Sequence, residues 1–323
     1  MSKKIINDVE IRVLGMRRSG NHPIINWLAS HYKGRVCFLN NCKPGLNPFS
    51  NFAGDSIKFI KNYPINLDKE GKGKFSKKKC LIHSYEDKFP KDVFNNKDFE
   101  KNHDKWLGKS KKCYNVLILR DPFNLFASRL FFCLHNKKNI EKSRNIHLWK
   151  EHAKEYLGIT NFIKENKIVI NYNLWFLSKD YRKEIAKKFG LRLNDEKIFD
   201  VPAYGKGSSF EWRKFDRKAN KMKVLERWKI MASNKFYRPV LEDEELKKLS
   251  DNVFGRFPDI ERVKRKKFII RYRFFGIFAR KKILLIVSVH SFLGKIGVYL
   301  KDKSPKVYYF LKELKREKVN YEN

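Results

Sequence analysis

Short runs of apolar residues alternate with segments of helical spacing up to about residue 200. Continuous apolar strands separated by helices are typical of a buried parallel sheet. The segments between the runs predict helices, one with Pro23 in its first position and another from about Leu174 to Gly190. The pattern therefore predicts an α/β fold, with a parallel sheet flanked by helices. The predicted strands are Val9–Leu14, Val36–Leu39, Cys80–His83, Tyr114–Leu119 and Lys167–Asn171.

Two stretches interrupt this alternation. Residues 40–79, between the second and third predicted strands, are rich in Gly, Pro, Asn and Lys. They predict a long excursion, which is either functional or disordered. After Asp200 a loop without clear periodicity leads to helical segments near Ala219–Met231 and Asp243–Val253.

The C-terminal part of the chain, residues 262–323, is strongly basic, with 18 Lys or Arg residues against 4 Asp or Glu. It contains an apolar run, Ile283–Leu300, which has basic residues on both sides and is interrupted by His290 and Lys295. These features predict either an amphipathic helix at an anionic membrane surface or a helix packed on the core, and both remain open. We therefore expect an α/β domain, residues 1–261, followed by a basic helical extension.

The whole chain carries 73 Lys and Arg residues against 35 Asp and Glu, a net charge of +38. This charge implies an anionic partner, such as a nucleotide, a glycan, a nucleic acid or a membrane, or else a solvated lysine-rich surface. The five cysteines are scattered and form no C-x-x-C pair, so we expect no metal site. The amino terminus lacks the apolar segment of a signal peptide, which favours a cytoplasmic location or the cytosolic side of a membrane.

The stretch "LGMRRSGNHPIINWL", Leu14–Leu28, places two glycines between the first predicted strand and a predicted helix. A glycine loop in this context directs backbone N–H groups towards an anion, and the helix dipole favours negative charge there. Arg17 and Arg18 add cations within the loop. A nucleotide-binding P-loop has lysine and then serine or threonine after its second glycine, where this chain has Asn21 and His22. The loop predicts a phosphate-type ligand, with a tight turn as the alternative.

A second motif follows the fourth predicted strand. Arg120 ends the strand, and Ser128 lies eight residues later on the helix that begins after Asp121 and Pro122. An arginine fork and a serine hydroxyl placed in this way can converge on one phosphate. The alternative is a structural turn between Arg120 and Asp121, with Ser128 as an ordinary helix residue.

These segments resemble the sulfotransferases that use 3′-phosphoadenosine 5′-phosphosulfate (PAPS) as the sulfonate donor. The segment Arg18–His22 matches that family's K-S-G-T-T loop, with arginine in the lysine position. Arg120 and Ser128 match its 3′-phosphate motif, and Tyr172 matches the tyrosine of a later strand end. Gly205–Arg213 resembles its C-terminal phosphate loop. The resemblance covers about residues 9–255.

The resemblance implies that PAPS is the donor and that no metal is required. It implies that His83 is the base for the acceptor hydroxyl and that Arg18 stabilises charge on the transferred group. Glu86 and His22 are the alternative bases. We expect the acceptor to be a sugar or glycan hydroxyl, because the long loop and the tail are basic. The implied contacts to PAPS come from Arg17, Arg18, Ser19, Gly20, Asn21, His22, Arg120, Ser128, Tyr172, Lys206 and Gly207.

Two other functions remain open on the sequence. A P-loop kinase-like phosphotransferase needs a magnesium-binding hydroxyl beside the loop and an acid at a strand end, to which Asn21, His22 and Asp121 correspond poorly. A non-enzymatic protein that binds nucleic acid or membranes would account for the basic charge. Helix-turn-helix, RNA-recognition and zinc-finger signatures are not apparent, so we expect no nucleic-acid partner. Residues 262–323 remain a candidate membrane-contacting segment.

Overall fold

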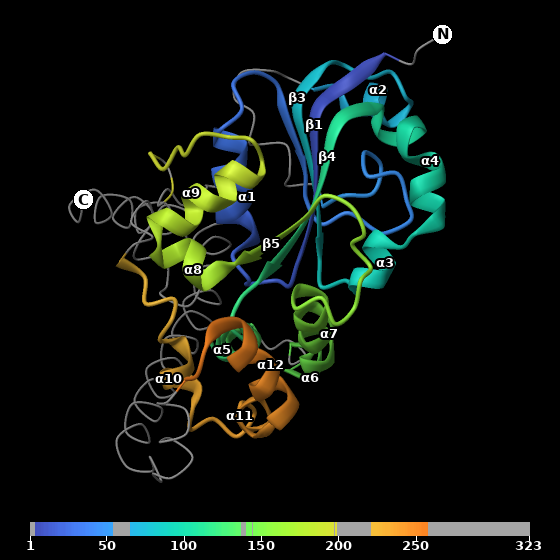
Figure 1. Ribbon diagram of the computed structural model, residues 1–323. Coiled ribbons are helices and arrows are strands. Elements are labelled where there is room, and N and C mark those ends of the chain that lie inside the picture. The colour runs from blue at the N-terminus through green and yellow to red at the C-terminus, as the bar shows by residue number, and fades with distance from the viewer. Residues whose placement is uncertain are drawn as a thin grey trace, which may run out of the picture. The chain divides into compact units, whose positions relative to one another are not determined.

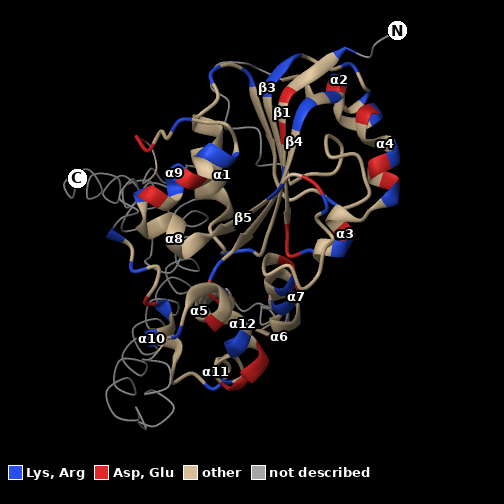
Figure 2. Ribbon diagram, viewed as in Figure 1, with Lys and Arg blue, Asp and Glu red and all other residues tan. Residues whose placement is uncertain are grey.

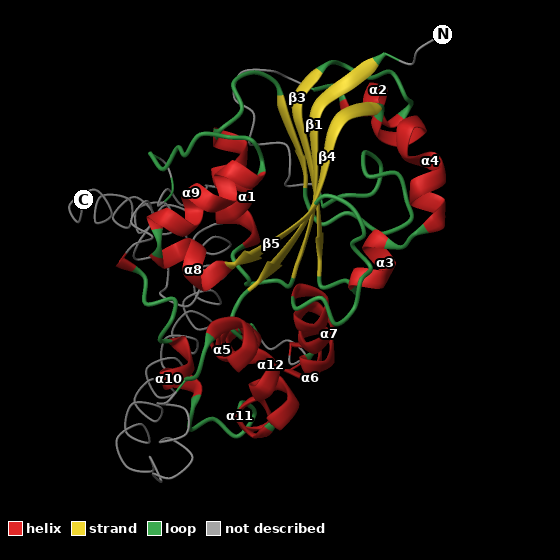
Figure 3. Ribbon diagram, in the orientation of Figure 1, coloured by secondary structure: helices red, strands yellow, loops and turns green. Residues whose placement is uncertain are grey.

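Five parallel strands form one sheet in the part of the chain that the structure describes. They lie in the order β2-β3-β1-β4-β5, and each neighbouring pair is parallel (Figure 3). Parallel neighbours need crossover connections, and helices make them here. The predicted α/β fold, a parallel sheet flanked by helices, is confirmed. The strands are β1 (Ile5–Gly15), β2 (Val36–Leu39), β3 (Lys78–Glu86), β4 (Lys109–Leu119) and β5 (Lys167–Asn171).

The computed structural model describes residues 4–53, 65–136, 140–143, 145–196, 198 and 221–257. All of these belong to one compact unit, Met1–Glu261. The basic extension expected at residues 262–323 lies outside the described residues. None of the described helices is both long and apolar enough to cross a membrane.

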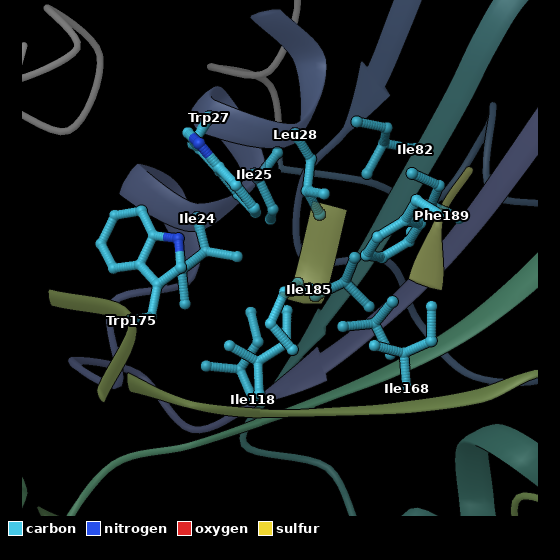
Figure 4. Packing of buried hydrophobic residues seen from close by; sticks show 14 of the residues in the cluster. Ile24, Ile25, Trp27, Leu28, Ile82, Ile118, Ile168, Trp175, Ile185 and Phe189 are labelled. Atoms are coloured by element: carbon cyan, nitrogen blue, oxygen red, sulfur yellow. The ribbon is translucent and has the colours of Figure 1, made fainter. Parts of the chain in front are cut away.

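One face of the sheet is covered by helices α1 (Asn21–Ser30), α8 (Tyr172–Leu177) and α9 (Lys179–Lys188) (Figure 1). Burying an aliphatic side chain here contributes about 1.5–3 kcal/mol. This packing holds α1 against the sheet, so that its amino terminus stays at the carboxyl ends of the strands. Buried hydrophobic side chains from these helices and from the strands pack together in one cluster. Figure 4 labels ten of them: Ile24, Ile25, Trp27, Leu28, Ile82, Ile118, Ile168, Trp175, Ile185 and Phe189.

Helices α3 (Pro90–Phe94) and α4 (Lys97–Leu107) pack on the opposite face (Figure 1). Their buried residues Val93, Phe99 and Leu107 join strand residues such as Leu14, Leu81 and Tyr85 in a second apolar cluster. Acidic and basic residues are mixed along α4, whereas the amino-terminal parts of β3 and β4 carry several lysines (Figure 2). Charged side chains are therefore unevenly distributed over the described part of the chain.

A further group of helices lies beyond the carboxyl ends of the strands (Figure 1). The hydroxyl of Tyr237 donates to the carbonyl oxygen of Phe123 at 2.7 Å, and Trp149 Nε1 donates to the carbonyl oxygen of Arg120 at 2.9 Å. These bonds fix the helices around the end of β4. They are α5 (Pro122–His135), α6 (Ile140–Ser143), α7 (Ile146–Tyr156), α10 (Arg227–Met231), α11 (Arg238–Glu242) and α12 (Glu244–Phe254).

Three strands are longer than the apolar pattern predicts. Strand β1 begins at Ile5, β4 begins at Lys109, and β3 continues to Glu86. The added positions carry polar side chains such as Asn7, which is buried and donates from Nδ2 to the carbonyl oxygen of Leu107 at 3.0 Å. At Asn7 hydrogen bonding replaces apolar burial, so hydrophobicity does not reveal that this residue belongs to the strand.

Two predicted helices begin or end elsewhere. Helix α1 begins at Asn21, which places Pro23 in its third position. The helix expected from Leu174 to Gly190 is two helices, because Ser178 interrupts it and accepts a hydrogen bond from the Tyr181 amide at 3.1 Å. That bond caps the second helix and satisfies one of its free N–H groups. The excursion at residues 40–79 contains the short helix α2 (Leu67–Gly71).

Candidate functional site

The glycine loop, residues 16–20, turns sharply between β1 and α1. Arg18 and Gly20 both have left-handed backbone conformations, with φ of 74° and 86°. A Cβ atom on Gly20 would lie 2.1 Å from a ring carbon of Tyr172, so glycine is required there. The first N–H groups of α1, including those of Asn21 and His22, have no acceptor within the helix. The loop therefore presents backbone donors at the carboxyl end of the sheet.

The Asn21 side chain closes this loop from inside. Its Nδ2 donates to the carbonyl oxygens of Gly15 and Met16, at 3.4 and 3.2 Å, and to Glu86 Oε1 at 3.2 Å. The residue is 4% exposed, and a Cβ on Gly15 would lie 2.2 Å from Asn21 Oδ1. Asn21 can therefore offer its backbone N–H to a ligand, while its side-chain amide stabilises the turn, and its expected contact with PAPS stays a prediction.

A carboxylate–arginine pair holds the outside of the loop. Asp87 accepts from the Arg17 amide at 3.0 Å and from both terminal nitrogens of Arg129, at 2.6 and 3.2 Å. Arg129 also donates to the carbonyl oxygen of Arg17 at 3.2 Å. Nothing in the sequence singles out Arg129, which is one of many basic residues and has no motif of its own. The side chain of Arg17 itself remains 58% exposed at the mouth of the loop.

Glu86 and His22 lie beside the loop. Glu86 is the last residue of β3 and is paired in register with Gly15. Its carboxylate lies 3.4 Å from Arg17 Nε and 4.0 Å from His22 Nε2. His22 Nε2 also contacts Asn40 Oδ1 at 3.3 Å. Both side chains keep some exposure, 12% for Glu86 and 27% for His22, so a carboxylate and an imidazole are accessible where the loop opens.

His83 is not part of this arrangement. It has no exposed surface, and its ring nitrogens contact Glu10 Oε1 and the Tyr85 hydroxyl, each at 3.1 Å. Burial lowers its pKa below the ordinary value. This corrects its expected position at the end of the third strand: β3 continues for three more residues, roughly 10 Å, to Glu86. The residue of this strand that reaches the loop is Glu86.

Arg120 connects the end of β4 to the glycine loop. Its Nη1 donates to the carbonyl oxygen of Arg18 at 2.8 Å, and its Nη2 donates to the carbonyl oxygen of Val224. The guanidinium also lies 5.0 Å from the centre of the Tyr172 ring, the same ring that covers Gly20. The structure therefore brings together two motifs that lie 102 residues apart in the sequence.

Ser128 meets a second arginine that the sequence analysis missed. Its hydroxyl donates to the carbonyl oxygen of Asn124 at 2.7 Å and accepts from Arg227 Nη1 at 3.0 Å. Arg227 lies on α10 and is only 6% exposed. A guanidinium beside a hydroxyl offers charged and neutral hydrogen-bonding groups of the kind that bind phosphate. Lys206 and Gly207, expected at the same ligand, lie outside the described residues.

Arg18 directs its side chain against α5. Its guanidinium lies 4.5 Å from the centre of the Phe132 ring. Burial lowers the pKa of Arg18, the nearby Glu86 carboxylate opposes that shift, and Arg129 and Arg120 add to it. Arginine stays charged under such conditions, because its ordinary pKa lies far above neutral pH. Four arginines, Arg17, Arg18, Arg120 and Arg129, therefore place positive charge around one loop.

Fold and site together define a parallel α/β protein whose glycine loop is surrounded by arginines. No family model and no curated protein matches the chain. Among solved structures, it is similar to the sulfotransferase domain of the Synechococcus PCC 7002 olefin synthase, at 9% identity and a TM-score of 0.46, over 79% of this chain and 98% of that one. It is also similar to mouse sulfotransferase SULT7A1 complexed with PAP, at 12% identity and a TM-score of 0.43, over 80% and 89%. Likeness at this level does not bear on the reaction.

Proposed function

We propose that this protein is a sulfotransferase that uses PAPS as donor and a sugar or glycan hydroxyl as acceptor. The observation that carries the proposal is the hydrogen bond from Arg120 to the carbonyl oxygen of Arg18. It unites the two sequence motifs that resemble phosphosulfate-binding and 3′-phosphate-binding segments. A donor with anionic groups at both ends suits a site in which arginines approach from two directions.

The buried polar atoms of the site fit such a donor. Ser19 Oγ and Arg120 Nε are buried and have no hydrogen-bond partner among the described residues. The backbone donors of the loop and the exposed cation of Arg17 suit the phosphosulfate end. Ser128 and Arg227 suit the 3′-phosphate, since they combine a hydroxyl with a buried guanidinium.

The proposed reaction is an in-line displacement at sulfur. PAPS supplies a sulfonate group whose bond to the 5′-phosphate breaks as a new bond to the acceptor oxygen forms. Glu86 takes the proton of the acceptor hydroxyl, because its carboxylate is partly exposed beside the loop, whereas the neighbouring Asp87 is held by both terminal nitrogens of Arg129. Arg17, Arg18 and the loop N–H groups stabilise negative charge on the equatorial and leaving oxygens. His22, 4.0 Å from Glu86, is the alternative base.

The test of the donor is calorimetry with adenosine 3′,5′-bisphosphate and with adenosine 5′-monophosphate. Arg227→Ala should lower the affinity for the bisphosphate about 10- to 100-fold, because a buried charged hydrogen bond contributes about 1.5–3 kcal/mol. The monophosphate should bind the variant and the wild type alike. Arg238→Ala is the matched control, since Arg238 is an exposed arginine that pairs with Glu242. Tighter binding of ATP, dependent on Mg²⁺, would contradict the proposal.

The phosphotransferase alternative is less well supported by the site. Asn21 occupies the position of the P-loop lysine, and its amide is turned into the loop, while His22 occupies the position of the magnesium-binding hydroxyl. Asp121 is fully buried and caps α5 by accepting from the Asn124 amide at 2.8 Å. Labelled PAPS, offered to a panel of sugars, glycans, lipids and phenols, is the direct assay for transfer and for the acceptor class.

A further inference from the structure

A second cluster of chemically active side chains lies on the α4 face of the sheet, away from the glycine loop. Glu10 comes from β1, His103 from α4 and Cys113 from β4. Glu10 lies five residues before the end of β1, roughly 16 Å from the glycine loop along the strand. The cluster is therefore separate from the proposed donor site, and none of the proposed chemistry uses it.

The three side chains are close enough to share one ion. Both oxygens of Glu10 lie near His103 Nε2, at 3.0 and 2.9 Å, and Glu10 Oε2 lies 4.0 Å from Cys113 Sγ. One ligand atom from each residue lies within 4.8 Å of the others. Around a tetrahedral zinc ion, bonds of 2.0–2.3 Å put neighbouring ligand atoms about 3–4 Å apart. Small side-chain movements would bring the cluster to that geometry.

The surrounding hydrogen bonds orient these groups as metal ligands are oriented in proteins. His103 Nδ1 contacts Asp104 Oδ1 at 3.0 Å, which leaves Nε2 directed at Glu10. Ser110 Oγ donates to Glu10 Oε2 at 2.5 Å, and His83 Nε2 donates to Oε1 at 3.1 Å. A ligating histidine commonly has a carboxylate on its other nitrogen, and a ligating carboxylate is itself hydrogen-bonded. Both conditions hold here.

The charge and ligand types also suit a cation at this point. Glu10 is 2% exposed, and its carboxylate is paired with His103 Nε2 at 2.9 Å; a metal ion bound between them would take over as the positive partner of the buried carboxylate. Imidazole, thiolate and carboxylate form a ligand set that suits zinc, whereas magnesium and calcium prefer oxygen alone. His103 and Cys113 are only partly buried, so an ion can enter from the surface.

We propose that Glu10, His103 and Cys113 bind a zinc ion, with water in the fourth position. His83 and Ser110 position the Glu10 carboxylate, and Asp104 positions the His103 ring. The ion connects α4 to β1 and β4 and so stabilises that side of the sheet. The cysteine spacing gave no expectation of this site, because the ligands come from three elements and are up to 103 residues apart.

The experiment is a cobalt titration of the full-length protein after chelation of bound metal. The expected result is one equivalent of bound Co²⁺, visible bands typical of tetrahedral coordination and a thiolate-to-cobalt charge-transfer band. Cys113→Ser should remove the charge-transfer band, and the matched control Cys133→Ser should keep it. Zinc should displace the cobalt and raise the melting temperature of the wild type.

Two histidine variants and one carboxylate variant complete the test. His103→Gln should abolish binding of one equivalent, while His147→Gln, an exposed histidine on α7, should bind as the wild type does. Asp104→Asn should lower the affinity for cobalt about 10- to 100-fold, because a metal-binding histidine that loses its supporting hydrogen bond typically loses affinity by that factor. If folded wild-type protein binds no stoichiometric cobalt, or if the thiolate band survives in Cys113→Ser, the proposal is overturned. These spectra need no PAPS, so the result is independent of the proposed sulfotransferase activity.

Discussion

The Arg120 guanidinium donates to the carbonyl oxygen of Arg18 at 2.8 Å, and this bond fixes the glycine loop to the end of β4. The same guanidinium donates to the carbonyl oxygen of Val224, which precedes α10. One planar fork thus joins the loop, the sheet and the segment that carries Arg227. A lysine has the same charge but lacks the fork.

We therefore expect Arg120→Lys to weaken the binding of adenosine 3′,5′-bisphosphate about 10- to 100-fold, because the substitution removes charged hydrogen bonds that contribute about 1.5–3 kcal/mol. Isothermal titration calorimetry measures the effect, and circular dichroism verifies that the variant is folded. Arg238→Lys, at an exposed residue of α11, is the matched control. Equal affinity in the two variants would show that Arg120 has no part in donor binding.

The contact between Gly20 and Tyr172 predicts a large loss of stability in Gly20→Ala. Any alanine with positive φ costs about 1–2 kcal/mol, and overpacking against the Tyr172 ring adds about 1–3 kcal/mol. Gly158→Ala is the control, since Gly158 has a similar φ of 77° but no heavy atom within 4 Å of an added Cβ. Urea denaturation of both variants measures the difference. Equal losses would mean that the Tyr172 ring does not cover the loop.

The sequence predicts best the short strands whose central residues are all apolar. Val36–Leu39 and Lys167–Asn171 were predicted with the bounds that β2 and β5 have. Strand β3 was predicted too short, because it ends on the polar residues Ser84 and Glu86 with Tyr85 between them. The mistaken position of His83 follows from that error, since a strand ending at His83 would expose it at the sheet edge.

The residues of the site could be predicted only where a local sequence pattern marks them. Two glycines after a strand, and an arginine at a strand end, are local patterns, so the loop and Arg120 could be found. Arg129 and Arg227 could not, because nothing distinguishes them among 73 basic residues until the fold brings them to Asp87 and Ser128. Contacts between residues about 40 or 100 positions apart cannot be predicted from the sequence pattern around either residue.

The position of Glu86 predicts its role as the base. In a transfer assay with labelled PAPS, Glu86→Gln should lower kcat about 10²- to 10⁴-fold, the usual contribution of a general base. Its affinity for adenosine 3′,5′-bisphosphate should stay unchanged. His83→Gln should instead lower the melting temperature, because His83 is buried against Glu10. If His22→Gln lowers kcat as much as Glu86→Gln while leaving affinity intact, His22 shares the proton transfer.

The basic extension predicts binding to anionic membranes. Residues 262–323 carry a large excess of Lys and Arg around an apolar run, so the full-length protein should sediment with phosphatidylserine vesicles and not with phosphatidylcholine vesicles. Rising salt should weaken this association, because screening shortens the range of surface charge. A chain that ends at residue 261 should still bind the nucleotide and should no longer bind phosphatidylserine vesicles. Unchanged vesicle binding by the shortened chain would assign it to the α/β domain.

His152 predicts a loss of stability at acidic pH. Its Nε2 donates to the carbonyl oxygen of Lys88 at 2.7 Å, and burial lowers its pKa to about 4. The unfolded chain binds a proton near pH 6.5, so the folded state loses stability as the pH falls from about 6.5 to about 4, by about 3 kcal/mol in total.

The variant His152→Gln isolates this contribution, because glutamine can keep a donor near Lys88 but does not titrate. Urea denaturation of the wild type and the variant at pH 7 and at pH 4.5 should show a smaller pH dependence in the variant. His147→Gln, which replaces an exposed histidine on the same helix, should keep the wild-type dependence. If His152→Gln also keeps it, the folded protein accommodates a protonated His152, and the acid sensitivity arises at other groups.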